Sequence, residues 1–269
     1  SHWENVAKST HLMNGNISDV YIQLDQIENA ISGKNAHSVT HQEFNKFNLN
    51  LLNTDFDLQE FQKYITNFHK LNFSLCLYGA SGTGKTAYAN YLANTLGLEV
   101  TQKKASDLLS PYIGETEHNI AKAFKESRQN KSVLIFDEGD SFLQDRTNAS
   151  RSWEITQVNE MLTQMENHPY PFICTTNLMN NLDKASMRRF TFKIKYDYLT
   201  EEQVKEAFHY FFKINLDECL HMKLTAGDFS VVRKKAEILG CLNDESKLIE
   251  MLGQEQECRE PVTRKIGFI

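Results

Sequence analysis

Gly79-Ala80-Ser81-Gly82-Thr83-Gly84-Lys85-Thr86 decides the fold, because this stretch fits the pattern G-x-x-x-x-G-K-[ST] at every fixed position. The apolar run 72–78 before it predicts a buried strand, and the run 86–96 after it predicts a helix. Glycines allow a tight turn in which successive N–H groups and the helix N-terminus point at one anion. A glycine-rich turn without a ligand is the alternative, but strand, loop and helix all lie where phosphate binding needs them.

Two side chains of this phosphate loop (residues 79–86) have expected roles in nucleotide chemistry. Lys85 is expected to reach the β- and γ-phosphates, and the Thr86 hydroxyl is expected to ligate Mg²⁺. The loop therefore predicts a site for ATP and Mg²⁺.

A second motif follows downstream, where the apolar run 132–136 ends in the adjacent carboxylates Asp137 and Glu138. The carboxyl ends of parallel strands face the ligand crevice. Asp137 is therefore predicted to hold Mg²⁺, and Glu138 to polarise the water that attacks the γ-phosphate. An apolar strand that happens to end in an acidic turn is the alternative, but after a complete phosphate loop the pair of motifs predicts an ATPase.

Two further positions are candidates for the same chemistry. The apolar run 171–176 ends at Asn177, whose amide could donate to a γ-phosphate oxygen and orient the water. Arg188 and Arg189 precede a strand-like run, 191–195, and arginine suits the charge that develops on a transferring phosphoryl group. Taken alone, such arginines are more often surface charges.

These motifs together make the chain resemble the AAA ATPases, a group of ring-forming enzymes that remodel proteins. The resemblance covers about residues 50–240 and rests on the order and spacing of four segments: 79–86, 133–138, 175–177 and 188–190. It implies that Asn177 is the sensor of the γ-phosphate, and that Arg188 and Arg189 are arginine fingers acting on ATP bound to the neighbouring subunit. The compact Arg-Arg-Phe form resembles the katanin and Vps4 branch of the family.

The sequence departs from the family pattern at three positions without loss of a charge or a metal ligand. Ala80 and Ser81 replace the two prolines usual in the loop, and Gly139 replaces the usual alanine after the acidic pair.

The segment Tyr112-Ile113-Gly114 resembles the first pore loop of the family, an aromatic, an aliphatic and a glycine before an acidic helix start. By this resemblance Tyr112 and Ile113 would grip a polypeptide in the central channel of the ring. Pro111 stands where a lysine often precedes the aromatic residue. An ordinary exposed loop tyrosine is the alternative interpretation of Tyr112.

Composition narrows the class of protein. The chain has 269 residues and a net charge of −6, which argues against general binding to nucleic acid phosphates. No apolar run approaches the roughly 20 residues that span a bilayer, and no signal peptide is visible. The five cysteines are odd in number and widely spaced, which is typical of reduced thiols and predicts a cytoplasmic protein. Cys76 and Cys174 fall on predicted buried strands.

The alternation of apolar runs and helical segments up to Tyr198 predicts a P-loop NTPase fold, an α/β doubly wound parallel sheet with helices on both faces. After Tyr198 the strands stop, and capping boxes at Thr200 and Thr225 open helices of a small all-helical lid domain. A third helix is expected over 244–251. The predicted organisation is an N-terminal helical or linker segment, the nucleotide-binding domain, the lid and a C-terminal tail, with the bounds 1–48, 49–198, 199–254 and 255–269.

Gly227 lies at the start of the second lid helix, which faces the nucleotide in the family. A small residue there would fit against the bound base or ribose. A capped core helix without contact to the nucleotide is the alternative.

The resemblance implies Mg²⁺-dependent ATP hydrolysis that drives protein remodelling by a ring, expected to be a homo-hexamer with ATP, acting on a protein substrate. The main alternative is an ATP-switched assembly or scaffold module, in which the bound nucleotide sets partner binding and no polypeptide is threaded through the ring. A nucleic-acid-loading ATPase of the wider superfamily is a third possibility, which the acidic composition and the Tyr-Ile-Gly loop disfavour. Similar modules also form the C-terminal parts of longer bacterial proteins.

Overall fold

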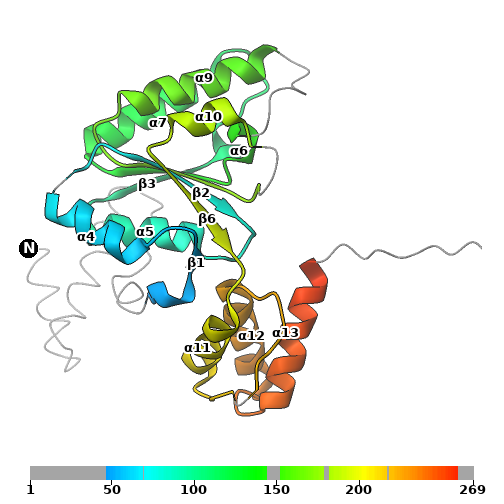
Figure 1. Ribbon diagram of the computed structural model, residues 1–269. Coiled ribbons are helices and arrows are strands. Elements are labelled where there is room, and N and C mark those ends of the chain that lie inside the picture. The colour runs from blue at the N-terminus through cyan, green and yellow to red at the C-terminus, as the bar shows by residue number, and fades with distance from the viewer. Residues whose placement is uncertain (1–46, 69, 144–151, 179–181, 217, 260–269) are drawn as a thin grey trace, which may run out of the picture. The chain divides into compact units, whose positions relative to one another are not determined.

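A six-stranded sheet forms the centre of the computed structural model (Figure 1), which describes residues 47–68, 70–143, 152–178, 182–216 and 218–259. The strand order is β1-β6-β2-β5-β4-β3, and all neighbours are parallel except β1 with β6. The strands are β1 (Asn53–Thr54), β2 (Ser74–Gly79), β3 (Val100–Lys104), β4 (Val133–Asp137), β5 (Phe172–Thr176) and β6 (Phe192–Asp197). The predicted α/β doubly wound parallel sheet is confirmed.

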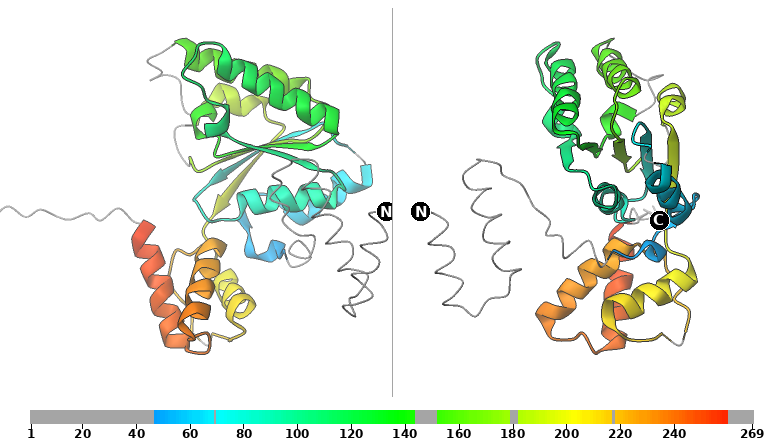
Figure 2. Two further views of the ribbon diagram at one scale, coloured as in Figure 1. Left: turned by 180° about the vertical axis from the view of Figure 1, so that it is seen from behind. Right: turned by 90° about the vertical axis from the view of Figure 1, so that its left-hand side faces the viewer.

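Helices cover both faces of this sheet, as Figures 1 and 2 show. Those of the sheet region are the short 3-10 helix η1 (Leu49–Leu51), α4 (Leu58–Phe68), α5 (Lys85–Thr95), α6 (Ala105–Leu108), α7 (Glu115–Asn130), α8 (Asp140–Leu143), α9 (Ser152–Glu166) and α10 (Lys184–Arg189). The side chains of strand β4 contribute to two apolar clusters. Leu134 and Phe136 belong to the apolar cluster that includes residues of α7 and α9, whereas Val133 and Ile135 belong to the cluster that includes residues of α4 and α5. Side chains alternate between the two faces of a strand, so an uninterrupted apolar run is buried on both.

The cysteines of the central strands are part of these cores. Cys76 and Cys174 are buried and free, as predicted. Met161 and Met165 on α9 are also buried in the core.

Three helices follow the sheet, α11 (Glu201–Phe212), α12 (Ala226–Leu239) and α13 (Glu245–Arg259), around an apolar cluster of their own. At the start of α11 the Thr200 hydroxyl accepts the Gln203 N–H at 3.2 Å, and the Gln203 side chain accepts the Thr200 N–H at 3.1 Å, so the predicted capping box is present. The function of these helices as a lid stays a prediction.

Helix α13 is longer than the sequence predicts, because it continues to Arg259 rather than ending near residue 251. Its last turns are held by contacts with the preceding helices and loop. Lys235 pairs with Glu255, and the Gln256 side chain accepts the Lys223 N–H at 3.0 Å. The expected tail therefore starts later than residue 255. The apolar stretch 17–31, which favours a helix within the predicted N-terminal segment, lies outside the described residues.

Candidate functional site

The phosphate loop connects β2 to α5 as predicted, with Lys85 as the first helical residue. Gly84 precedes the helix with φ of 95°, a left-handed conformation that glycine adopts without steric cost. The first N–H groups of an α-helix have no partner inside the helix and favour negative charge. The loop and the 11-residue helix α5 therefore provide an anion site of the kind that binds phosphate groups.

Lys85 is buried, and its ammonium group donates three hydrogen bonds. The acceptors are the carbonyl oxygens of Gly79 at 2.9 Å and Ala80 at 2.7 Å, and Asn177 Oδ1 at 3.0 Å. Burial lowers the pKa of Lys85 to about 8, while the carboxylates of Asp140 and Asp137 act in the opposite direction. The structure thus brings together the predicted loop lysine and the predicted sensor asparagine, from residues 92 positions apart.

The two predicted metal ligands are also adjacent. The Thr86 hydroxyl donates to Asp137 Oδ1 at 2.7 Å. Asp137 accepts further hydrogen bonds from the Thr175 hydroxyl at 2.5 Å and from Gln102 Nε2 at 3.1 Å. Mg²⁺ holds oxygen ligands at about 2.0–2.1 Å in an octahedron, so neighbouring ligands lie about 2.9 Å apart. Thr86 and Asp137 fit two adjacent positions of such a shell.

Glu138 follows directly after β4 and has a strained backbone. Its φ of 56° is left-handed, which costs a residue other than glycine about 1–2 kcal/mol. The other described non-glycine residues with positive φ, Lys131 and Lys213, end helices α7 and α11, where this conformation is usual. Glu138 does not end a helix, and its N–H donates to the Thr175 hydroxyl at 3.2 Å. A strained residue that hydrogen bonds hold in place is typical of functional sites.

Asp140 is a site residue that the sequence analysis missed. Its Oδ1 accepts from the Thr176 hydroxyl at 2.6 Å and from the Asn177 N–H at 3.0 Å. These bonds tie the end of β5 to the start of α8 and position Asn177 beside Lys85. The sequence feature that could have identified Asp140 is its position as a third carboxylate, three residues after Asp137.

The glycine that replaces the usual alanine after the acidic pair has a steric reason. A Cβ atom on Gly139 would lie 2.5 Å from Cys174 Sγ and 3.3 Å from the carbonyl oxygen of Thr175. The Gly139 N–H also donates to that oxygen at 2.8 Å. This close approach of the two chain segments leaves no room for a side chain.

Arg188 and Arg189 lie at the end of α10, whose N-terminus Asp183 caps by accepting the Ser186 N–H at 2.8 Å. Both arginines are exposed, and Arg189 Nη1 lies 3.4 Å from Glu166 Oε1. Within the described part of the chain, no hydrogen bond or ion pair joins either arginine to the phosphate loop.

The predicted pore-loop residues form a turn before α7. Tyr112 is 73% exposed and Ile113 is 90% exposed, and Gly114 precedes the helix with φ of 83°. The Ser110 N–H donates to the Thr116 hydroxyl at 2.9 Å, so the helix start holds the base of the turn. The two apolar side chains are therefore presented to solvent.

Gly227, at the start of α12, contacts the phosphate loop. Its N–H donates to the carbonyl oxygen of Gly82 at 2.9 Å, and a Cβ atom on Gly227 would lie 2.9 Å from the Gly82 Cα. The carboxylate of Asp228 accepts the Thr225 N–H at 2.6 Å and the Thr225 hydroxyl at 2.8 Å. The capped start of α12 thus packs against the middle of the loop, and a contact of Gly227 with base or ribose stays a prediction.

None of the helices in the described ranges combines the length and the apolar character needed to cross a membrane.

Comparison with known proteins adds a family and several relatives. The model of the "ATPase family associated with various cellular activities (AAA)" matches residues 75–198. An uncharacterized AAA family ATPase of Sinorhizobium fredii is 38% identical over 124 residues, which are 45% of this chain and 38% of that protein. The peroxisomal ATPase pex6 of Schizosaccharomyces pombe is 33% identical over 138 residues, 48% of this chain and 15% of the relative.

A plant relative extends the match. Protein SUPPRESSOR OF K(+) TRANSPORT GROWTH DEFECT 1 of Arabidopsis thaliana is 29% identical over 185 residues, 66% of this chain and 41% of its own length. The chain spans less than half the length of each of these three relatives.

Proposed function

The chain belongs to the AAA family of ATPases, and we propose that it couples Mg²⁺-dependent ATP hydrolysis to protein remodelling in a ring of subunits. The observation that carries this proposal is the convergence of Lys85, Asp137 and Asn177 at the phosphate loop. Family members named as ATPases share this region of the chain.

In this proposal the phosphates of ATP lie against the loop and the N-terminus of α5. Lys85 exchanges the carbonyl oxygens of Gly79 and Ala80 for oxygens of the β- and γ-phosphates. Thr86 and Asp137 would hold Mg²⁺, which when bound neutralises charge that develops on the phosphates. The lowered pKa of Lys85 still leaves the ammonium mostly charged at pH 7.

The attacking water is oriented by Glu138 and Asn177. The Glu138 carboxylate accepts a hydrogen bond from the water and polarises it for attack on the γ-phosphorus. Asn177 is held by Asp140 and by Lys85, so its amide has a fixed position beside the lysine. Such fixed polar groups need no reorganisation when the reaction occurs.

Arg188 and Arg189 complete the site of the neighbouring subunit. They are exposed and make no described contact with their own phosphate loop, which is what arginine fingers acting in trans require. A finger of this kind contributes about 10³–10⁵ in rate. Isolated subunits are therefore expected to turn over slowly.

Remodelling is assigned to the Tyr112–Ile113 turn, which presents two exposed apolar side chains that can hold a polypeptide. Tyr112→Ala should abolish ATP-driven unfolding of a tagged test protein while basal ATP turnover persists. If the assembled protein instead acts as an ATP-switched scaffold, this substitution leaves nucleotide-dependent partner binding unchanged.

ATP turnover per subunit, measured over a wide range of protein concentration, tests the proposal. Glu138→Gln serves as the blank, because it keeps the shape of the side chain but removes the carboxylate. We expect wild-type activity per subunit to rise steeply with concentration, while the variant binds ATP without turnover. Wild-type turnover by Glu138→Gln would remove the role assigned to Glu138.

A further inference from the structure

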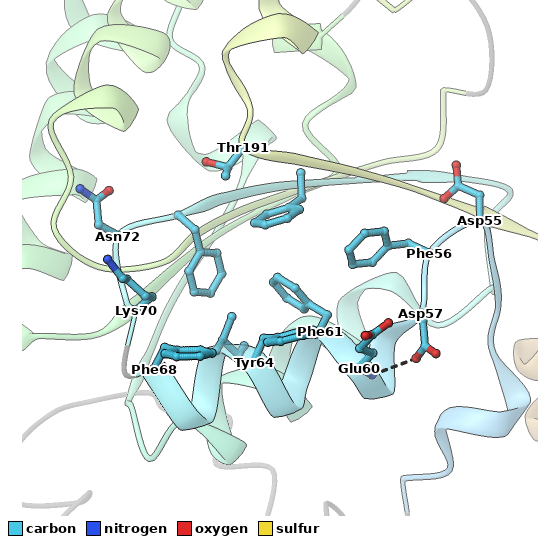
Figure 3. Close-up of a pocket in the computed structure, with 13 residues that line it drawn as sticks. Asp55, Phe56, Asp57, Glu60, Phe61, Tyr64, Phe68, Lys70, Asn72 and Thr191 are labelled. Carbon is cyan, nitrogen blue, oxygen red and sulfur yellow. Dashed lines mark hydrogen bonds between the residues drawn. The ribbon is translucent and has the colours of Figure 1, made fainter.

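An aromatic groove of about 730 Å³ lies between α4 and the start of β6 (Figure 3). Six rings line it: Phe56, Phe61, Tyr64, Phe68, Phe73 and Phe192. Phe61 is central, with its ring centroid 4.9 Å from that of Phe192 and 5.8 Å from that of Phe73. Farther along α4, Tyr64 is 55% exposed and Phe68 is 66% exposed. Adjoining exposed aromatic side chains along a groove indicate a surface that binds another apolar segment.

The charges of the groove are unevenly placed. Figure 3 shows Asp55, Asp57 and Glu60 at one end and Lys70 at the opposite end. Asp57 accepts the Gln59 N–H at 2.9 Å at the start of α4, and Asp55 accepts the Lys195 N–H at 2.8 Å. In the ranges that the structure describes, no basic side chain forms a salt bridge with these three carboxylates, and only Asp55 has an electrostatic interaction with a lysine, Lys195. An occupant that joins basic to apolar residues would therefore match this surface.

We propose that the groove binds residues 260–269 of the same chain, which lie outside the described structure. This segment reads Glu-Pro-Val-Thr-Arg-Lys-Ile-Gly-Phe-Ile, so two cations directly precede a mainly apolar run. Arg264 and Lys265 face the carboxylates of the acidic end. Ile266, Phe268 and Ile269 cover the exposed rings of α4.

Contacts within the described structure place the start of this segment near the acidic end. Arg259, the last residue of α13, lies over the ring of Tyr198, with its guanidinium carbon 5.4 Å from the centroid. The carbonyl oxygen of Tyr198 accepts a hydrogen bond from Asn53 Nδ2 at 2.5 Å, and Asp55 is two residues beyond Asn53. Ten extended residues span up to about 33–36 Å. The segment therefore has the length to pass the acidic end and continue along α4.

Charge also separates this occupant from residues 17–31, an apolar stretch that likewise lies outside the described structure. The predicted helix 17–31 is apolar enough to cover aromatic rings, but it carries Asp19, Asp25 and Glu28 and no lysine or arginine. Like charges at the acidic end would oppose its binding. Arg264 and Lys265 instead attract the same carboxylates.

Photo-crosslinking in the full chain tests the proposal. Phe268 is replaced by p-benzoylphenylalanine, the sample is irradiated, and crosslinked peptides are identified by mass spectrometry. We expect products with the mass of one chain and crosslinks to α4 between Leu58 and Phe68. Phe68→Glu in the same chain should lower their yield about tenfold, since removal of a buried aromatic contact commonly has an effect of this size. Ile238→Glu is the matched control, because Ile238 is an apolar residue on α12 that is 77% exposed.

Charge reversal provides a second readout. Arg264→Glu with Lys265→Glu should lower the crosslink yield, and Glu60→Lys in the same chain should restore part of it. Crosslinks that lie outside the groove, or a yield that Phe68→Glu leaves unchanged, would overturn the proposal. Groove crosslinks found only at the mass of two chains would assign the groove to a second copy and would equally contradict binding within one chain.

Discussion

Replacing Gly227 by alanine should weaken nucleotide binding about tenfold or more, because α12 and the phosphate loop have no space between them at this residue. The added Cβ atom would lie 2.9 Å from the Gly82 Cα and 3.0 Å from the Gly82 carbonyl oxygen. Both distances are well below ordinary contact, and both neighbours are backbone atoms that cannot rotate away. The loop or the helix must therefore shift.

The expected loss of nucleotide affinity follows from the two interactions that the substitution affects, because nucleotide binding must return the displaced loop to its original position. The hydrogen bond from the Gly227 N–H to Gly82 contributes about 0.5–1.5 kcal/mol. Forcing a methyl group into a filled space costs about 1–3 kcal/mol. The lower limits together, about 1.5 kcal/mol, already correspond to roughly tenfold in an equilibrium constant.

A fluorescent ADP analogue titrated into the full chain measures this effect. Gly253→Ala is the matched control, because it is the same substitution in α13, where the nearest atom to the new Cβ is Met222 Cε at 3.9 Å. We expect Gly253→Ala to bind as the wild type does and to melt at the same or a slightly higher temperature. Wild-type affinity in Gly227→Ala would refute the coupling of the loop to α12.

Three further predictions concern residues around the site and the core. Asp140→Ala should lower single-turnover hydrolysis about 10- to 100-fold with little change in nucleotide affinity, because it removes the acceptor that holds Asn177 and Thr176; equal loss of both quantities would contradict this positioning role. Gly139→Ala should lower the free energy of unfolding by about 1–3 kcal/mol, and Cys174→Ala in the same chain should recover part of that loss, as chemical denaturation can show. Burial, reinforced by Arg128, lowers the pKa of His168 to about 4, so the unfolded chain binds the proton more readily and stability is lost as pH falls from about 6.5 to about 4. The loss should reach about 3 kcal/mol and should be absent in His168→Gln; an identical pH profile for the two proteins would exclude His168 as its cause.

The strand ends of the site were predictable, because the chemistry there depends on local patterns. Lys85 and Thr86 belong to a contiguous loop, and Asp137 and Asn177 each follow an apolar run of strand length. Parallel strands bring such ends to one edge of a sheet, and the observed contacts of Lys85 with Asn177 and of Thr86 with Asp137 follow from that rule.

Contacts between distant segments were not predictable in the same way. The approach of Gly227 to Gly82 depends on how α12 packs, and a glycine at a helix start has many possible reasons. The role of Asp140 depends on the register of β5 beside β4, which a single sequence does not reveal. The extension of α13 to Arg259 depends on partners such as Asp228, whose Oδ2 lies 2.9 Å from Arg259 Nη2. These features arise from tertiary packing rather than from local propensity.

The aromatic groove could not be predicted from the sequence either. Phe61, Phe73 and Phe192 each belong to a different segment, and their sequence positions indicate burial rather than a shared surface. The short strand β1, which pairs antiparallel with β6 and leads to the acidic end of the groove, is too short to recognise from its sequence.

A mixing experiment decides whether ATP is hydrolysed at a site shared by two subunits. One variant, Glu138→Gln, lacks the carboxylate that polarises water, and the other, Arg188→Ala with Arg189→Ala, lacks the fingers. Each variant alone should hydrolyse almost no ATP. An equimolar mixture should regain up to about a quarter of wild-type turnover, because in about a quarter of the head-to-tail interfaces one subunit supplies Glu138 and its neighbour supplies Arg188 and Arg189. A mixture that hydrolyses almost no ATP although the two variants assemble together would contradict a shared site. Wild-type turnover by the arginine variant alone would also contradict it.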